Sequence, residues 1–211
     1  MLTLELADWR RRVNSLYAEI RAEPNPRVAW SRWKQTRDDL FCSHSQSPIS
    51  AERRPAYTGI PVWPYDETLR FEVDLVEENS DESASESANG YDAAGGKDGV
   101  ISLRKVGVTS GLAESVGQEL SVFWVTGYGG GLFLPFKDKT SGSETYGGGR
   151  YLLDGIKGAD LGMRDGKLIL DFNFSYLPSC THSPEWVCPL APPENALAVQ
   201  IRAGEHLPSE Q

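Results

Sequence analysis

The sequence predicts an α+β protein that is mainly β: an antiparallel sheet, closed or half-closed as a barrel, with two N-terminal helices packed on it. Three observations lead to this prediction. Helical periodicity is confined to residues 1–41, and from residue 69 onward segments alternate apolar and polar residues between Gly, Asp or Ser turns. No long helical pattern lies between these segments, so parallel strands joined by helical crossovers are not expected.

The two helices are predicted from the spacing of their apolar residues. The first spans residues 5–22 and places five apolar side chains on one face: Trp9, Val13, Leu16, Tyr17 and Ile20. Pro24 ends it. Asn25 followed by Pro26 is typical of an N-cap and a first-turn proline, so a second helix is expected from there to about Phe41. Its apolar stripe belongs in the core: Trp30, Trp33, Leu40 and Phe41.

Strands are predicted over residues 69–77, 99–108, 119–127, 131–137, 167–173 and 197–204, and a further one after Arg150. Asp165 and Gly166 before Lys167 are a strong hairpin signal, because both central residues of the tight turn need positive φ. We expect residues 1–54 to form a helical pair and connector and residues 55–211 a β-rich core, packed as one structural unit.

The acidity of the chain is concentrated in one insert. Residues 77–98 carry seven acids and one lysine, which accounts for −6 of the formal net charge of −9. With one aromatic residue, this segment has too little apolar surface to offset its ordering entropy. It is predicted to be a solvated, mobile loop between two strands.

Composition excludes several classes of protein. A content of 39% hydrophobic residues, with six Trp, eight Tyr and seven Phe, indicates a folded domain. No apolar run approaches a membrane span, and the N-terminus lacks the pattern of a signal peptide, so we expect a cytoplasmic protein with no membrane partner. Nucleic acid is not an expected partner, since residues 1–54, the most basic region, net only +3. Three cysteines argue against a secreted disulfide framework.

Several motifs resemble a known family. These are LPFKDKTSGSETYGGGRYL at 134–152, FNFSYLPSC at 172–180, WVCPLAPPEN at 186–195 and IRAGE at 201–205, with RDDLFCSHSQSPI at 37–49 also fitting. The chain resembles the bacterial and archaeal family known as domain of unknown function 1684 over most of its length, apart from the acidic insert. The resemblance implies no activity. It implies that the following residues belong to the family pattern, whereas His182 and His206 do not: Phe136, Asp138, Thr140, Gly142, Glu144, Tyr146, Gly147, Arg150, Cys180, Cys188, Pro189, Glu194 and Asn195.

The leading hypothesis is a binding site for a small anionic molecule. Arg150 supplies a fixed, planar cation, and Gly147, Gly148 and Gly149 allow backbone N–H groups to approach a bound anion closely. Lys137 adds a second cation. The side chains expected to orient the ligand are Tyr146, Asn173 and Tyr176. The GGGR segment matches neither the Walker pattern nor GxGxxG, so it supports nucleotide binding only weakly, and the sequence leaves the cofactor unknown.

Two other classes of function fit the same residues. In an enzyme, Glu144 or Asp138 would act as a base beside an Arg150 clamp; Asp171 and Glu194 form another carboxylate pair. In a structural or interaction protein, Arg150 would instead pair with Glu144 or Asp138 inside the sheet, and the glycines would form a bulged turn.

The cysteines and histidines give a weaker signal. Cys180, His182 and Cys188, together with Cys42 and His44, offer enough ligands for zinc, but their spacing matches no known zinc pattern. A disulfide or a near contact between Cys180 and Cys188 is favoured, in a proline-stiffened loop that acts as a lid or plug. A hydrolase triad would have to use His44 with a nearby serine or Cys42, and no GxSxG elbow is present.

Overall fold

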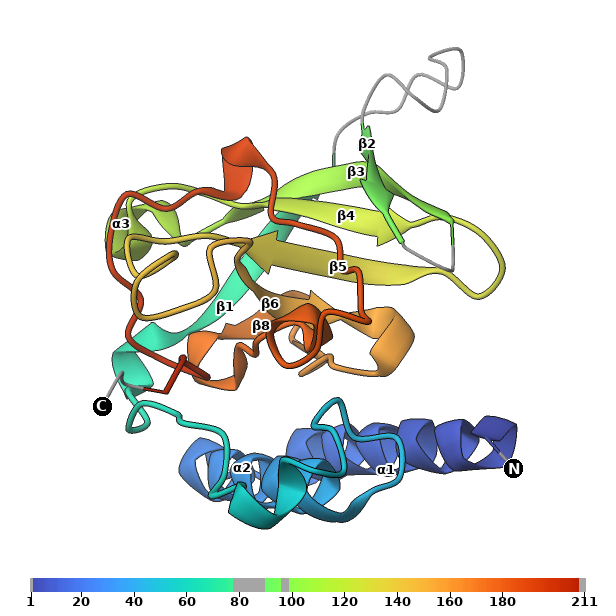
Figure 1. The fold of residues 1–211 in the computed structure, drawn as a ribbon. Coiled ribbons are helices and arrows are strands. Elements are labelled where there is room, and N and C mark those ends of the chain that lie inside the picture. Colours follow the sequence, from blue (N-terminus) through green and yellow to red (C-terminus); the bar gives the residue numbers. More distant parts are fainter. Residues whose placement is uncertain (1, 78–89, 96–98, 209–211) are drawn as a thin grey trace.

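The computed structural model describes residues 2–77, 90–95 and 99–208. Its two long helices, α1 (Leu2–Ala22) and α2 (Pro26–Ser43), lie side by side beneath the sheet (Figure 1). The Asn25 side chain caps α2 by accepting hydrogen bonds from the N–H groups of Arg27 and Val28. The predicted helix pair and its cap are therefore confirmed.

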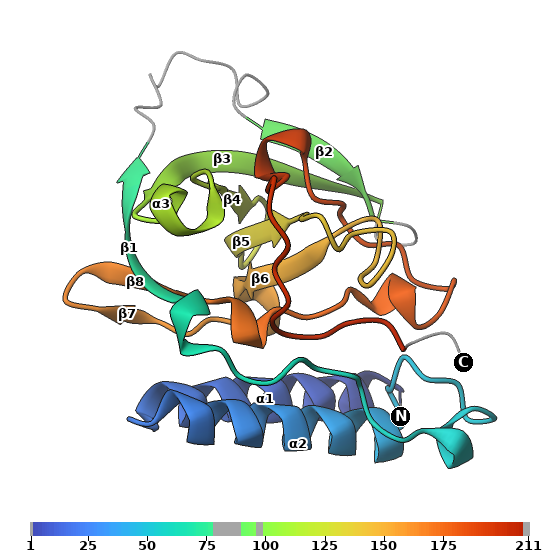
Figure 2. The same ribbon diagram turned by 90° about the vertical axis from the view of Figure 1, so that its left-hand side faces the viewer.

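Within the described ranges, eight strands form one antiparallel sheet in the order β6-β5-β4-β3-β1-β8-β7, with β2 paired to β3. Their bounds are β1 Arg70–Glu77, β2 Gly90–Ala94, β3 Val100–Ser110, β4 Ser121–Val125, β5 Gly131–Phe136, β6 Arg150–Asp154, β7 Met163–Arg164 and β8 Lys167–Asp171. The sheet curls into a half-barrel with the helices along one side (Figure 2), which confirms the predicted fold class. A short helix, α3 (Ala113–Val116), follows β3. The described part of the chain also contains six 3-10 turns: Arg54–Ala56, Glu67–Leu69, Gly155–Lys157, Phe172–Phe174, Ser179–Thr181 and Pro193–Asn195.

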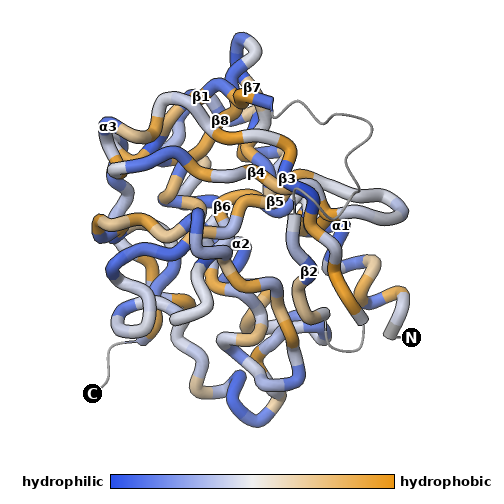
Figure 3. The backbone as a smooth tube through the Cα atoms, turned by 90° about the horizontal axis from the view of Figure 1, so that it is seen from above, coloured by the Kyte–Doolittle hydropathy of each residue, from blue (hydrophilic) through white to orange (hydrophobic). Residues whose placement is uncertain are grey.

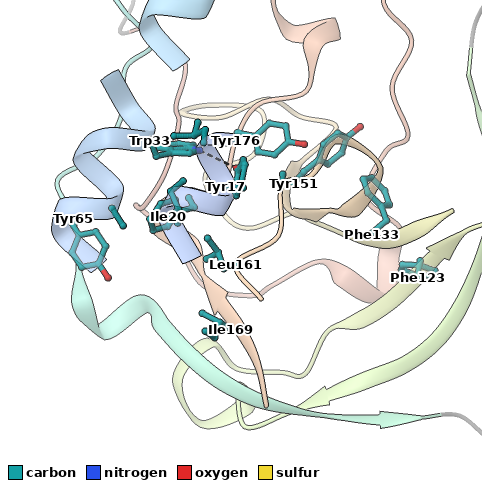
Figure 4. Packing of buried hydrophobic residues seen from close by; sticks show 14 of the residues in the cluster. Tyr17, Ile20, Trp33, Tyr65, Phe123, Phe133, Tyr151, Leu161, Ile169 and Tyr176 are labelled. Atoms are coloured by element: carbon teal, nitrogen blue, oxygen red, sulfur yellow. Dashed lines mark hydrogen bonds between the residues drawn. The ribbon is translucent and has the colours of Figure 1, made fainter. Parts of the chain in front are cut away.

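Alternation along the strands separates two hydrophobic cores. Leu168 and Leu170 of β8 belong to the barrel core, which also contains Val122 and α3, whereas Ile169 between them belongs to the helix-side core. Hydrophobic and hydrophilic stretches accordingly alternate along the chain (Figure 3). The helix-side core joins α1 and α2 to the sheet through the residues labelled in Figure 4: Tyr17, Ile20, Trp33, Tyr65, Phe123, Phe133, Tyr151, Leu161, Ile169 and Tyr176.

A buried ion pair links the helices to the C-terminal segment. The Arg37 Nε on α2 lies 2.6 Å from the Glu205 carboxylate, whose side chain is 1% exposed. The other oxygen of Glu205 accepts the N–H of Leu177 at 2.8 Å. The guanidinium of Arg37 also lies over the rings of Trp33 and Tyr176. Both charges are therefore satisfied within the helix–sheet junction.

The prediction of a strand over residues 197–204 is wrong. This segment is irregular, although Leu197, Ile201 and Ala203 are buried in the barrel core and explain the alternating pattern. Instead of forming a ladder with a neighbouring strand, its backbone groups bind both side chains and separate backbone groups, such as the carbonyl of Lys137, which accepts from the N–H of Leu197 at 2.8 Å. The N–H of Ile201 donates to the Asp138 carboxylate at 2.5 Å, and the carbonyls of Ile201 and Ala203 accept from Arg150.

The predicted loop at residues 77–98 is partly wrong as well. Glu77 belongs to β1, and residues 90–94 form β2, which pairs with β3. The pairing is supported by Tyr91, whose ring meets Phe123 edge-on with the centroids 5.3 Å apart. Residues 78–89 and 96–98 lie outside the described residues. The turn at Asp165 and Gly166 has positive φ at both residues and joins β7 to β8, so the predicted hairpin is confirmed.

Candidate functional site

A cavity of about 890 Å³ opens between the sheet and the segment that follows β8. One wall consists of β2 with Lys105 of β3 and Phe123 of β4. The opposite wall consists of Tyr146 and part of the C-terminal region: Cys180, Trp186, Val187, Cys188 and residues 190–194. The volume falls in the range of small-molecule sites, roughly 300–1,000 Å³.

Hydrogen bonds hold the two walls together. The Tyr91 hydroxyl of β2 donates to the carbonyl of Leu190 at 3.1 Å, and the Tyr151 hydroxyl of β6 donates to the carbonyl of Pro189 at 2.7 Å. The N–H of Ala191 donates to the carbonyl of Gly148 at 3.0 Å. The C-terminal wall is thereby tied to three separate parts of the half-barrel.

Apolar side chains gather at the rim of the cavity. Trp186, Val187 and Leu190 are 46%, 46% and 49% exposed, and all three line it. Exposed large apolar side chains scattered singly are normal in a folded protein, whereas a group of them around one concavity marks an interaction site. The rim therefore favours a ligand with an apolar body.

Two free thiols, Cys180 and Cys188, lie on the wall of this cavity. The Cys180 thiol and backbone N–H both hydrogen-bond to the Cys188 sulfur. With help from the Lys157 ammonium and the Tyr151 hydroxyl, these bonds outweigh burial and lower the pKa of Cys188 to about 6. The bond to Cys188 and burial raise the pKa of Cys180, and the bond to Cys180 raises the pKa of Tyr146. The predicted near contact is present without a disulfide.

Arg150 lies inside the protein, away from this cavity's lining. Its side chain is 1% exposed. Its NH1 nitrogen donates to the carbonyls of Ala203 and Glu205, and its NH2 nitrogen donates to that of Ile201 at 2.7 Å. Burial lowers the pKa of Arg150 to about 10, against the opposing effect of Asp138 and Glu205, so the group stays charged at neutral pH. This geometry favours the structural alternative; the anion clamp stays a prediction.

The two candidate bases are already engaged by protein groups. The carboxylate of Asp138 lies 3.7 Å from the NH2 nitrogen of Arg150 and accepts from Thr140 Oγ1 at 2.8 Å. The half-buried Glu144 instead pairs with Arg202 at 2.9 Å, and this bond lowers the pKa of Glu144. Neither carboxylate lines the cavity. Asp171 is likewise buried, accepting from the Tyr65 hydroxyl at 3.0 Å, whereas Glu194 lines the cavity.

The glycine triplet allows close packing of the cavity wall. Gly149 has a φ of +101°, and a Cβ there would approach the carbonyl oxygen of Phe136 to 2.5 Å. A Cβ at Gly148 would meet Tyr146 at 2.3 Å and Leu190 at 2.7 Å. Gly147 has ordinary space around it. These glycines therefore form a turn against residues 190–191, and the backbone of Lys137 pairs with Asn195 and Leu197.

The side chains expected to orient the ligand are only partly brought together. Tyr146 lines the cavity. Asn173 is fully buried and exchanges hydrogen bonds with the backbone of Asp66, at 2.8 and 2.7 Å. The Tyr176 hydroxyl donates to Asp154 at 2.9 Å within the helix-side core.

The histidines and Cys42 do not join the thiol pair in a metal cluster. The described residues contain no group of three or more His, Cys, Asp or Glu side chains arranged to hold a metal ion. His182 packs edge-on against Phe41, with the centroids 5.1 Å apart. His44 lies 3.1 Å from Asp8, and Cys42 is exposed on α2.

Sequence reasoning missed the wall of the cavity that the sheet forms, because Tyr91 fell in the predicted loop and Phe123 was assigned no functional role. The opposite wall lies largely in the proline-stiffened loop around Cys180 and Cys188 that the sequence singled out. The aromatic residue within the acidic insert was the one available signal, because it breaks an otherwise polar composition.

The protein is a half-barrel with two packed helices, and it has a cavity with an apolar rim beside a pair of thiols. The model of the family DUF1684, described as protein of unknown function, matches residues 55–206, and the chain belongs to this family. The resemblance inferred from the sequence is thus confirmed. The chain is also similar to the solution NMR structure of an uncharacterized protein from Haloarcula marismortui, with 28% identity, a TM-score of 0.55, and coverage of 84% of this chain and 92% of that chain. A search of curated proteins found no match.

None of the helices among the described residues has the length and apolar character needed to cross a bilayer.

Proposed function

We propose that this protein binds a small molecule with an apolar body in the cavity between β2 and residues 180–194. The observation that carries the proposal is the gathering of Trp186, Val187 and Leu190 around a concavity of about 890 Å³. Phe123 and Tyr91 supply aromatic surface deeper in the cavity. The sequence prediction of a cytoplasmic protein is kept within this proposal, because free thiols suit a reducing compartment.

The charge of the lining narrows the ligand. Among the residues that the structure describes, three charged ones line the cavity, namely Asp92, Lys105 and Glu194, and Asp92 accepts a hydrogen bond from Ser102 at 2.6 Å. One cation against two acids does not suit a multiply charged anion. The predicted anionic ligand is therefore refined to a molecule with at most one negative charge.

The test uses 8-anilinonaphthalene-1-sulfonate, a probe with an apolar body and one negative charge. Its fluorescence is titrated with the wild type and with Trp186→Ala and Leu190→Ser, two changes at exposed positions that leave the core intact. We expect each variant to weaken probe binding on the order of tenfold, equivalent to about 1.4 kcal/mol.

Trp124→Ala is the matched control. Trp124 is 39% exposed on β4 and does not line the cavity, so its removal should leave the probe affinity unchanged. Equal affinity in all four proteins, or no saturable binding by the wild type, would reject the proposal and favour an interaction protein without a small ligand.

A further inference from the structure

We propose that Cys188 and Cys180 form a thiol–disulfide exchange site on the wall of the cavity, with Cys188 as the nucleophile and Cys180 as the resolving thiol. The site would act on a low-molecular-weight disulfide that enters through the apolar rim. The proposal goes beyond ligand binding, and it does not depend on which other molecule the cavity holds.

The two thiols are accessible from one cavity and lie close to each other. Both sulfur-bearing residues line the same cavity, so a reagent inside it reaches either of them. Both are free thiols, and their side chains are hydrogen-bonded to each other. Thiols already in contact need little rearrangement to close into a disulfide.

The hydrogen bonds around the two thiols run from Tyr146 through Cys180 to Cys188. They form a chain in which the Tyr146 hydroxyl bonds to Cys180, and the Cys180 thiol and backbone N–H bond to the Cys188 sulfur. Donors converge on Cys188, which favours its thiolate. Cys180 stays protonated, because ionising it would cost the bond that it donates.

The charges around Cys188 also favour its thiolate. The titratable groups that face it are Cys180, Tyr146, Tyr151 and Lys157. The Lys157 ammonium is the cation among them; it also binds Asp154 at 2.9 Å, which moderates its effect. The net result is the lowered pKa of Cys188, and the thiolate is the form that attacks disulfides.

The reaction balances as two displacements. The Cys188 thiolate attacks one sulfur of RSSR, forms a mixed disulfide and releases RS⁻. The Cys180 sulfur then attacks the Cys188 sulfur, and the second R group leaves as RSH with the proton from Cys180. The protein dithiol is oxidised to a disulfide, and the small disulfide is reduced to two thiols.

The test treats the reduced wild type with 2-hydroxyethyl disulfide at neutral pH and follows it by intact mass and peptide mapping. We expect a Cys180–Cys188 bridge, seen as the loss of two hydrogen atoms from the peptide that holds both cysteines, with no reagent retained on that peptide. Cys42 is exposed and does not belong to this pair, so its thiol should keep one half of the reagent. Cys42 therefore serves as the internal comparison.

Two variants separate the roles of the thiols. Cys180→Ser should trap one half of the reagent on Cys188, whereas Cys188→Ser should leave Cys180 largely unmodified over the same time. In the reduced wild type, the rate of alkylation of Cys188 by iodoacetamide, followed by peptide mapping, should rise with pH through a midpoint near 6, compared with about 8.5 for an ordinary thiol.

The wild-type experiment needs no variant to fold and decides the proposal by itself. Stable adducts on both Cys180 and Cys188 without a bridge, or no reaction at either while Cys42 reacts, would overturn it. Titration of the double variant Cys180→Ser/Cys188→Ser with 8-anilinonaphthalene-1-sulfonate distinguishes a failure of the exchange site from a failure of ligand binding in the cavity. Retained probe binding there, with no exchange in the wild type, rejects the exchange site alone.

Discussion

Replacing Arg150 with Met is expected to destabilise the fold strongly. Met keeps part of the apolar stem, but it removes the guanidinium charge that lies over the rings of Phe136 and Trp63 and all five N–H donors. The change removes one donor from each of the carbonyls of Ile201, Ala203 and Glu205; the Ala203 carbonyl keeps its bond from Ser175 Oγ.

The expected magnitude follows from the burial of these groups. The side chains of Arg150 and Asp138 are 1% and 0% exposed, so the carboxylate of Asp138 is left as an uncompensated buried charge. Removing one partner of a buried pair costs about 3–5 kcal/mol. Asp138 keeps its bonds to Thr140 and the N–H of Ile201, which argues for the lower half of that range.

The assay is equilibrium unfolding in urea, comparing Arg150→Met with Arg202→Met. Arg202 carries the same side chain and also pairs with a carboxylate, that of Glu144, but its side chain is 54% exposed. Exposed ion pairs contribute about 0–1 kcal/mol, so the control should unfold close to the wild type.

The two hypotheses for Arg150 predict opposite results. An Arg150→Met protein within about 1 kcal/mol of the wild type would refute the structural assignment. If carboxylates or phosphates also raised the melting temperature of the wild type but not that of the variant, the anion clamp would be supported instead.

Two further predictions concern His182 and the glycine turn. Burial, with Arg37 and Arg53 nearby, lowers the pKa of His182 to about 4, so the folded state favours the neutral ring. The contribution of the neutral His182 ring to stability is present above about pH 6.5 and is lost as the pH falls toward 4. Between pH 7 and 5, the free energy of unfolding in urea should therefore fall by about 2 kcal/mol more for the wild type than for His182→Gln. Parallel pH curves of the two proteins would contradict this. Gly149→Ala should lower the unfolding free energy by about 1–3 kcal/mol, because Gly149 has a positive φ and lies close to a carbonyl oxygen of β5. Gly147→Ala should change the unfolding free energy by no more than about 0.5 kcal/mol. Equal melting temperatures of the two variants would refute the structural role assigned to Gly149.

Local chemistry explains what the sequence by itself determined. The Asn25 cap, the apolar face of α1 and the turn at Asp165 and Gly166 depend on chain neighbours, so their spacing predicted them. Alternation predicted most strands and hence the half-barrel. The same rule failed at residues 197–204, because buried alternate residues also occur where an irregular segment is bound by side chains.

Long-range contacts decided the rest. Arg150 finds its carbonyl partners at residues 201–205, and Tyr91 meets the wall of the cavity at Leu190, far along the chain. No local pattern encodes these pairings, since they arise only when the curled sheet brings distant backbone groups together. The cavity and the contact between Cys180 and Cys188 have the same origin: the first needs two walls from separate parts of the chain, and the second depends on how residues 180–188 fold against β6.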